Sequence, residues 1–180
     1  MSTKVVTGRV RMGYPNLFTP RADPNGRMKY SVLVLVPKSD KATIKRLQEA
    51  IKEAALAGFG DKVKLSALKV SLRDGDAEDK GPDYEGHYFF NASNKDKPGV
   101  IDGERQHILD PDQVTSGDWG RVSANAYSYD HPVGGKGVSF GLLNVQWLGE
   151  GDPIGNRSRA EDDFAEAWGK SDDAEEGDPW

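Results

Sequence analysis

Two long segments with the alternation of a β-strand, residues 119–129 and 138–148, flank a glycine-rich stretch and constrain the fold more than any other feature. In the first segment every second residue is small or apolar: Gly120, Val122, Ala124, Ala126 and Ser128. Successive side chains of a strand point to opposite faces, so these residues share one face, which suits the crowded interior of a small barrel. The stretch 134–137, Gly-Gly-Lys-Gly, predicts the hairpin turn that joins the two strands.

Shorter segments of strand character precede this hairpin. Residues 4–12 predict a strand with Arg9 and Arg11 on a basic face and a core face made of Val6, Gly8, Val10 and Met12. Residues 30–36 form a continuous apolar run, typical of a strand buried on both faces. Further strands are expected over 63–72, 84–92 and 100–102, and loops over 14–20, 23–26 and the acidic stretch 74–83.

One segment has the periodicity of a helix. Ile44, Leu47, Ile51 and Ala54 form an apolar stripe, which Ser39 or Asp40 would cap and Gly58 or Gly60 would end. The fold class predicted is therefore mainly β with one main α-helix. An OB-fold-like small antiparallel barrel with extended loops is the leading candidate, since it combines about five strands with one intervening helix.

Composition limits the function classes. The chain has 180 residues and no cysteine, which excludes disulfides and thiolate metal sites. It contains no apolar run of about 18 residues, so no membrane partner is expected and the protein is predicted to be soluble and intracellular. We expect an OB-fold-like domain over residues 1–150 and a flexible acidic tail over 151–180.

The tail is strongly acidic. Residues 161–180 hold nine carboxylates and one lysine, which gives them a net charge of −8 and leaves residues 1–160 at +3. Such a block repels itself and usually serves as an interaction segment. A short helix over 159–168 is expected to dock transiently. The residues predicted to bind a partner protein are Asp172, Asp173, Glu175, Glu176, Asp178, Pro179 and Trp180.

The second face of segment 119–129 carries aromatic and polar side chains: Trp119, Arg121, Ser123, Asn125, Tyr127 and Tyr129. Rings interleaved with a guanidinium and an amide are typical of a platform on which bases stack without sequence preference. The alternative is that Tyr127 and Tyr129 fill the core. Basic residues elsewhere favour the first interpretation, because phosphates are met by Lys and Arg. The complete predicted nucleic-acid interface is Arg9, Arg11, Tyr14, Arg27, Lys29, Tyr88, Lys95, Lys97, Trp119, Arg121, Tyr127, Tyr129 and Lys136.

Signals of catalysis are weak. His87, His107 and His131 have no metal-ligand spacing, and the glycines before Lys136 do not match a Walker motif. Asp74, Asp76, Glu78 and Glu85 have the spacing of a calcium loop, but Asp79 replaces its obligatory glycine. A metal-dependent nuclease built on Asp74, Asp76 and Asp83 lacks a general base or a lysine partner in the sequence. We therefore expect no cofactor, no metal and no enzymatic activity, and interpret residues 73–76 as a structural turn in which the arginine pairs with a carboxylate.

A series of motifs along residues 5–165 resembles a known family. The series comprises Arg9-Val10-Arg11-x-x-Tyr14-Pro15-Asn16-Leu17-Phe18-x-Pro20, Lys29-Tyr30-Ser31-Val32, Pro37-Lys38-Ser39-Asp40, Arg73-Asp74-Gly75-Asp76, Tyr84-x-Gly86-His87-Tyr88-Phe89, Lys97-Pro98-Gly99-Val100, Ser116-Gly117, Lys136-Gly137-Val138 and Gly151-Asp152-Pro153-Ile154-Gly155. It is similar to the phage-encoded single-stranded DNA-binding proteins with an OB fold that were long catalogued as a domain of unknown function. The chain end, Asp178-Pro179-Trp180, is similar to the acidic Pro-Phe end of bacterial single-stranded DNA-binding proteins, with Trp in place of Phe.

The resemblance implies single-stranded DNA binding in phage replication or recombination, in the cytoplasm of an infected bacterium. The tail would compete with DNA and recruit replication or recombination proteins. Two alternatives stay open: an acidic DNA mimic that inhibits a host DNA-binding protein, and a nuclease that uses Asp74 and Asp76. Oligomeric state (monomer or dimer), nucleotide site size, preference for DNA over RNA and the strand face that meets DNA are also open.

Overall fold

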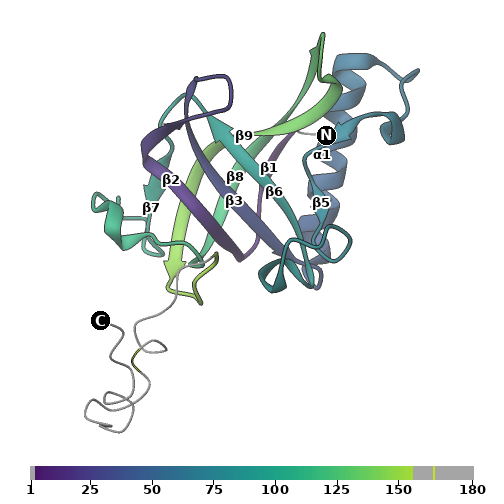
Figure 1. Ribbon diagram of the computed structural model, residues 1–180. Coiled ribbons are helices and arrows are strands. Elements are labelled where there is room, and N and C mark those ends of the chain that lie inside the picture. The colour runs from purple at the N-terminus through teal and green to yellow at the C-terminus, as the bar shows by residue number, and fades with distance from the viewer. Residues whose placement is uncertain (1–2, 156–163, 165–180) are drawn as a thin grey trace, which may run out of the picture.

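A closed barrel of five strands forms the centre of the computed structural model, which describes residues 3–155 and Phe164 (Figure 1). The barrel strands are β2 (Val10–Ala22), β3 (Met28–Pro37), β6 (His87–Asn94), β8 (Trp119–His131) and β9 (Gly135–Gly149). Their spatial order is β8-β2-β3-β6-β9, and pairing of β8 with β9 closes the ring. Strands β6 and β9 run parallel and the other barrel pairs run antiparallel. This arrangement confirms the predicted OB-like fold class.

Four short strands extend the barrel. Strand β1 (Lys4–Val6) pairs with β8, β4 (Lys69–Val70) and β7 (Gly99–Ile101) pair with β9, and β5 (Arg73–Asp74) pairs with β6. Three 3-10 turns, Leu65–Ala67, Pro82–Tyr84 and Pro111–Gln113, lie in the connections. The sheet on the β8–β9 side is thus widened by β1 on one edge and by β7 and β4 on the other.

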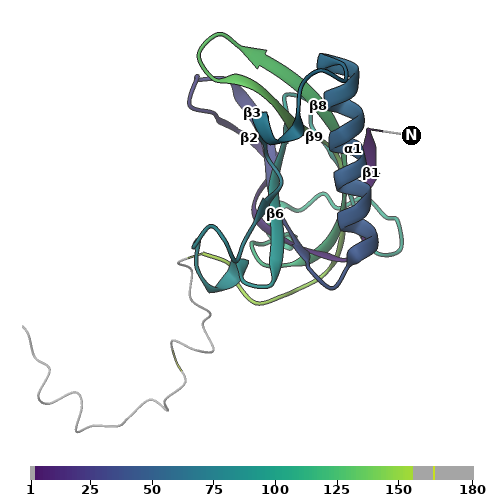
Figure 2. The same cartoon turned by 90° about the vertical axis from the view of Figure 1, so that its right-hand side faces the viewer.

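Helix α1 (Lys41–Phe59), the one α-helix among the described residues, covers one side of the barrel (Figure 2). Asp40 caps it by accepting a hydrogen bond from the Thr43 amide at 3.2 Å, and Gly60 with a φ of 74° ends it. The predicted stripe is buried against the barrel core. Gly58 lies so close to Ser128 of β8 that a Cβ there would overlap the serine hydroxyl, so the glycine lets the helix lie directly on the sheet.

A second, smaller apolar cluster lies on the outer surface of β3 and β6. Leu33, Leu35 and Phe89 point outward there and are covered by Ile154, whose side chain is 2% exposed. Ile154 belongs to residues 150–155, which we call the C-terminal strap. The strap is held by hydrogen bonds between Ser116 and Ile154 in both directions. Residues 151–155 of the predicted flexible tail are therefore packed on the barrel.

The structure corrects three strand predictions. Residues 14–20, predicted as a loop, belong to β2, where register shifts between Gly13 and Arg21 absorb the prolines. The predicted strand 4–12 is broken at residues 7–9, and because of this bend Val5 is buried while Val6 is exposed. The predicted strand 63–72 is reduced to β4, since most of the segment forms a 3-10 turn and irregular chain.

Two further expectations fall at or beyond the described part of the chain. Apart from Phe164, the helix predicted over 159–168 lies outside the described residues, as do the residues predicted to bind a partner protein: Asp172, Asp173, Glu175, Glu176, Asp178, Pro179 and Trp180. Among the described residues, the structure contains no helix that is long and apolar enough to cross a membrane.

Candidate nucleic-acid interface

Strand β8 has the two faces that its alternation predicts. Gly120, Val122, Ala124 and Ala126 are buried, and the side chains between them point away from α1 toward solvent. Tyr127 is 40% exposed, so it does not fill the core. The outward faces of β8 and β9 together form one solvent-facing surface, which we call the outer face.

Trp119 lies at the start of β8, under two arginines. The guanidinium carbon of Arg9 is 4.5 Å and that of Arg11 is 5.8 Å from the indole centroid. Arg11 also donates hydrogen bonds to the carbonyls of Gly117 and Asp152 and so fixes the C-terminal strap. Trp119 is about 26 Å from Tyr127 along the strand, at about 3.3 Å per residue, so the predicted platform divides into two separate clusters.

Tyr127 and Tyr129 line a groove of about 340 Å³ near the β8–β9 turn, which we call the hairpin groove. The ring of Tyr129 lies across the backbone of Gly137, where a Cβ would come within 2.4 Å of the tyrosine hydroxyl. The rings of Tyr129 and His131 are 5.3 Å apart. An accessible tyrosine beside a second ring and a cation is the arrangement that base stacking needs.

Three residues of this groove escaped the sequence analysis: Lys69, His131 and Ser139. Lys69 reaches it through the parallel pairing of β4 with Gly137, a long-range contact with no local signal. Alternation along 138–148 could have found Ser139, since it lies between the buried Val138 and Phe140. Lys136 does not line the groove; its Nζ is 5.5 Å from the ring of Phe59 at the end of α1.

A second set of predicted cations lies at the β2–β3 turn and the nearby turn 94–97. Tyr30 pairs with Asn94, which brings Arg27 and Lys29 beside the turn that carries Lys95 and Lys97. Lys29 lies 3.8 Å from Asp23, and the Nζ of Lys97 is 5.8 Å from the ring of Phe18. The backbone N–H of Arg27 hydrogen-bonds to Asp23 and lowers the pKa of that carboxyl, so the turn keeps an ionised aspartate near neutral pH.

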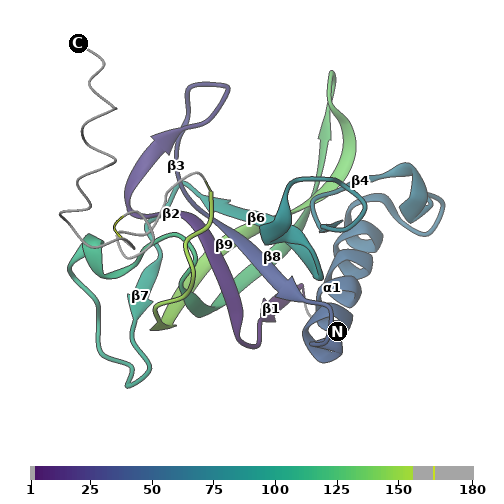
Figure 3. The ribbon, with the colours of Figure 1, turned by 60° about the horizontal axis from the view of Figure 1, so that its bottom comes forward.

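The β2–β3 and β8–β9 hairpins project from the same side of the barrel (Figure 3). A row of four small polar residues and one glycine, which we call the polar row, crosses the sheet between them, in register from strand to strand: Asn16, Ser31, Ser93, Gly141 and Asn125. If Gly141 carried a Cβ, its nearest neighbours, which include the Tyr127 ring, would be 3.7–3.9 Å away, so this part of the surface is open. In OB barrels the outer face of the second and third strands, here β3 and β6, is the usual oligonucleotide surface. The C-terminal strap covers the part of this surface that contains Leu33, Leu35 and Phe89, and it leaves the polar row accessible.

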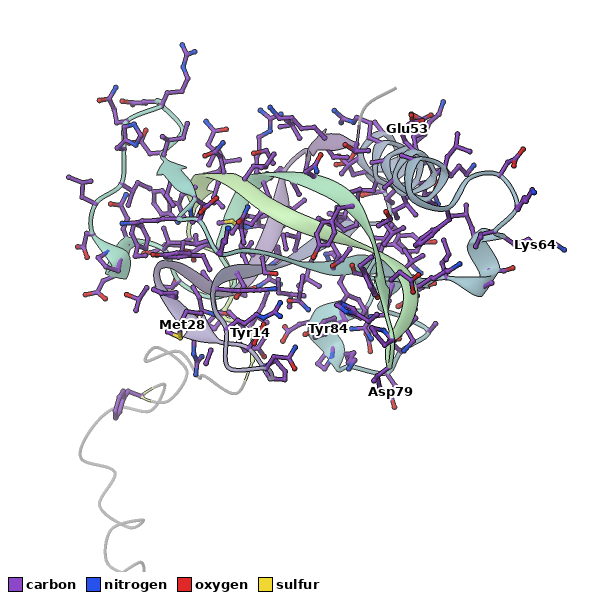
Figure 4. All side chains as sticks on the ribbon, turned by 90° about the horizontal axis from the view of Figure 1, so that it is seen from above. Tyr14, Met28, Glu53, Lys64, Asp79 and Tyr84 are labelled. Carbon is purple, nitrogen blue, oxygen red and sulfur yellow. The ribbon has the colours of Figure 1, made fainter. Side chains whose placement is uncertain are left out.

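Tyr14 and Tyr88 lie outside both aromatic clusters. Tyr14 is exposed in a bulge of β2 with a φ of 45° (Figure 4). A Cβ on Gly155 of the strap would lie 2.7 Å from its hydroxyl. Tyr88 faces the barrel interior, packs against the core and carries the Nζ of Lys38 at 5.3 Å from its ring. Their predicted contact with nucleic acid stays a prediction.

Comparison with known proteins decides the family. A family model described as "Enterobacter phage Enc34, ssDNA-binding protein" matches residues 3–176. The chain belongs to this family. "Putative protein p50" of Acyrthosiphon pisum secondary endosymbiont phage 1 is similar in sequence. It is 31% identical over 159 residues, and the aligned part covers 83% of this chain and 85% of the relative.

Two solved structures of phage single-stranded DNA-binding proteins resemble this chain over most of its length. The single-stranded DNA-binding protein from bacteriophage Enc34, in complex with ssDNA, has a TM-score of 0.76 and 25% identity, with 85% of this chain and 90% of that chain covered. Gp2.5 of bacteriophage T7, a single-stranded DNA-binding protein, has a TM-score of 0.62 and 14% identity, with 94% and 98% covered. At that identity, the similarity to gp2.5 concerns the fold alone.

The acidic loop of this family member is closed by an ammonium group. Lys38 Nζ lies 2.7 Å from Asp74 Oδ1 and 2.6 Å from Asp76 Oδ2. Its hydrogen bonds lower the pKa of both carboxyls, and the bond to Asp74, ahead of that to Asp76, raises the pKa of Lys38. The sequence analysis found no lysine partner for this loop because Lys38 is 36 positions away from Asp74.

The remaining geometry of the loop is that of a turn. The Gly86 amide donates to Asp76 at 2.9 Å, and Arg73 pairs with Glu78 at 3.3 Å, as the turn interpretation predicts. Over the residues that the structure describes, no group of three or more His, Asp or Glu side chains is placed to hold a metal ion.

Proposed function

We propose that this protein binds single-stranded DNA without sequence preference, in the replication or recombination of phage DNA, and that it does so without catalysis. Membership of the Enc34 family supports this function, and so does the OB-like barrel. The observation that carries the proposal is the hairpin groove, where Tyr127 and Tyr129 face solvent beside Lys69.

We place the path of the DNA strand on the surface between the two hairpins. The polar row between the two hairpins gives a nucleic-acid chain room to approach, because its side chains are short. Bases stack on Tyr127 and Tyr129 at one end, while Arg27, Lys29, Lys95 and Lys97 meet phosphates at the other. Each stacked base is worth about 1–3 kcal/mol and every base has a ring face, so affinity comes without sequence preference.

The acidic tail is proposed to regulate this binding in the cytoplasm of the infected cell. Its net charge of −8 would compete with phosphates for the lysines and arginines of the barrel. Its end, Asp178-Pro179-Trp180, would be bound by replication or recombination proteins. The C-terminal strap supports the first role, because it starts the tail from the outer surface of β3 and β6, beside the polar row.

The proposal is tested by titrating fluorescent oligo-dT with the full chain over a salt series, with duplex DNA of equal length as competitor. We expect binding that survives the competitor and weakens steeply with salt, since counterions are released from the phosphates. Absence of binding by the full chain and by a chain ending at residue 160, at low salt, would refute it. The DNA-mimic alternative would then take its place.

A further inference from the structure

A second groove on the outer face lies between β1 and β7 and has no role in the binding path described above. It has a volume of about 270 Å³. Two rows of paired residues cross it: Val6, Ser123, Asn144 and Gly99 in one, and Arg121, Gln146 and Ile101 in the other. His107, bridged to Ile101, closes the second row. We call it the β1–β7 groove.

The groove combines apolar walls with polar groups at defined places. Its exposed lining is mostly apolar, and Val6, which is 39% exposed, and the half-buried Ile101 form opposite walls. A Cβ on Gly99 would lie 2.8 Å from the Asn144 side-chain oxygen, so a larger residue at this position would displace the Asn144 side chain. A flat molecule with apolar faces and a polar edge fits such a space.

The hydrogen-bonding groups define that edge. Asn144 uses its Oδ1 to accept from the Gly99 amide at 3.0 Å, Gln146 uses its Nε2 to donate to the Asp102 carbonyl at 3.2 Å, and Arg121 uses its Nε to donate to the Thr7 carbonyl at 3.0 Å. Within residues 3–155, the side-chain N–H groups of Asn144, the Oε1 of Gln146 and the terminal N–H groups of Arg121 make no further protein hydrogen bond, whereas the backbone N–H of Asn144 donates to Ser123 Oγ. The groove thus offers a donor, an acceptor and a donor.

We infer that the β1–β7 groove takes one unstacked nucleobase of the bound single strand. A nucleobase carries both acceptors and donors on its edge, and single-stranded bases are recognised through such edges once they are splayed out. The groove is continuous with the proposed path, because Ser123 and Asn144 follow directly on Asn125 and Gly141 at the end of the polar row. This inference rests on the proposed function and adds a base-binding site on β8 and β9.

The test uses two substitutions in the groove and one control. Val6→Phe fills the space from an exposed edge, and Gln146→Leu removes the acceptor with little change of shape. Gln48→Leu, on the exposed side of α1, makes the same chemical change away from the outer face. Thermal unfolding checks that each variant is folded, and fluorescence anisotropy with oligo-dT gives its affinity.

Because one base contact is lost, both groove variants are expected to bind oligo-dT at least about fivefold more weakly than the wild-type chain. Gln48→Leu is expected to bind with wild-type affinity. The slope of affinity against salt stays unchanged, because no phosphate contact is lost. Independently of any variant, oligonucleotides that carry 4-thiothymidine are expected to cross-link to the segment 99–107 of the wild-type chain.

Normal affinity of both groove variants, with cross-links confined to the hairpin groove, would overturn the inference and leave the proposed function intact. Failure of the wild-type chain to bind oligo-dT at all would overturn the proposed function, and this inference with it. The two failures are therefore distinguishable in one titration.

Discussion

Tyr127→Ala is the substitution that most sharply separates binding from stability. Tyr127 lies on the outer face with 40% of its surface exposed, and its ring lies beside Gly141, which has no side chain to cover it. Removing the ring deletes one stacking surface, worth about 1–3 kcal/mol, so the affinity for oligo-dT falls about 5- to 150-fold. Because the residue packs little against the core, the midpoint of denaturant unfolding moves only slightly.

Two further variants make this measurement specific. Leu56→Ala removes an exposed apolar side chain from α1, on the other side of the sheet, and is expected to leave the affinity unchanged. Tyr129→Ala lowers both affinity and stability, since its ring also packs across Gly137. The assay is fluorescence anisotropy at one salt concentration, paired with urea unfolding. Wild-type affinity of a folded Tyr127→Ala protein would refute the stacking argument.

The other predictions concern the tail, the acidic loop and the hairpin. Deleting residues 161–180 changes the net charge from −5 to +3, so oligo-dT binding tightens at low salt and the gain shrinks as salt is raised; an equal affinity at low salt would exclude competition by the tail. Lys38 lowers the pKa of Asp74 and Asp76, so their ionised forms stabilise the fold above about pH 4, and this contribution is lost as the pH falls through their pKa values in the folded protein. In Lys38→Met, the free energy of urea unfolding should therefore fall less steeply as the pH is lowered below about 4. Gly137→Ala forces a Cβ against Tyr129 and the Lys69 carbonyl and costs about 1–3 kcal/mol of unfolding free energy, whereas Gly134→Ala, with its nearest neighbour at 3.6 Å, costs less; equal stabilities would show that the Tyr129 ring and the β4 backbone both move aside freely.

Local patterns were sufficient to predict the barrel and its helix. The stripe from Ile44 to Ala54, with Asp40 before it and Gly60 after it, is a complete helix signal, and the alternation along β8 separates a buried face from an exposed one. The part of β2 after Met12 could not be predicted, because its bulges interrupt the period-2 pattern at Tyr14-Pro15. Bulges depend on the partner strand, which the local sequence does not contain.

The candidate site was predicted only in part, for a similar reason. Tyr127 and Arg121 follow from alternation alone, but Lys69 and Lys38 reach their positions through pairings that are distant in sequence. His107 reaches the β1–β7 groove through a bridge to Ile101, which no pattern in the sequence predicts. Sequence order also joined Trp119 to Tyr127 in one platform, whereas the strand keeps them about 26 Å apart and places Trp119 under two arginines. Distance along a strand, and not only the shared face, decides which side chains can act together.

The central claim is that single-stranded DNA binds between the two hairpins and stacks on the outer face of β8. It is tested most directly by nuclear magnetic resonance, following the ring signals of the tyrosines during titration with oligo-dT. We expect the signals of Tyr127 and Tyr129 to shift and broaden first, while Tyr84, packed beneath the C-terminal strap, stays unchanged. Saturation of the protein with oligo-dT while the rings of Tyr127 and Tyr129 remain unperturbed would contradict the account.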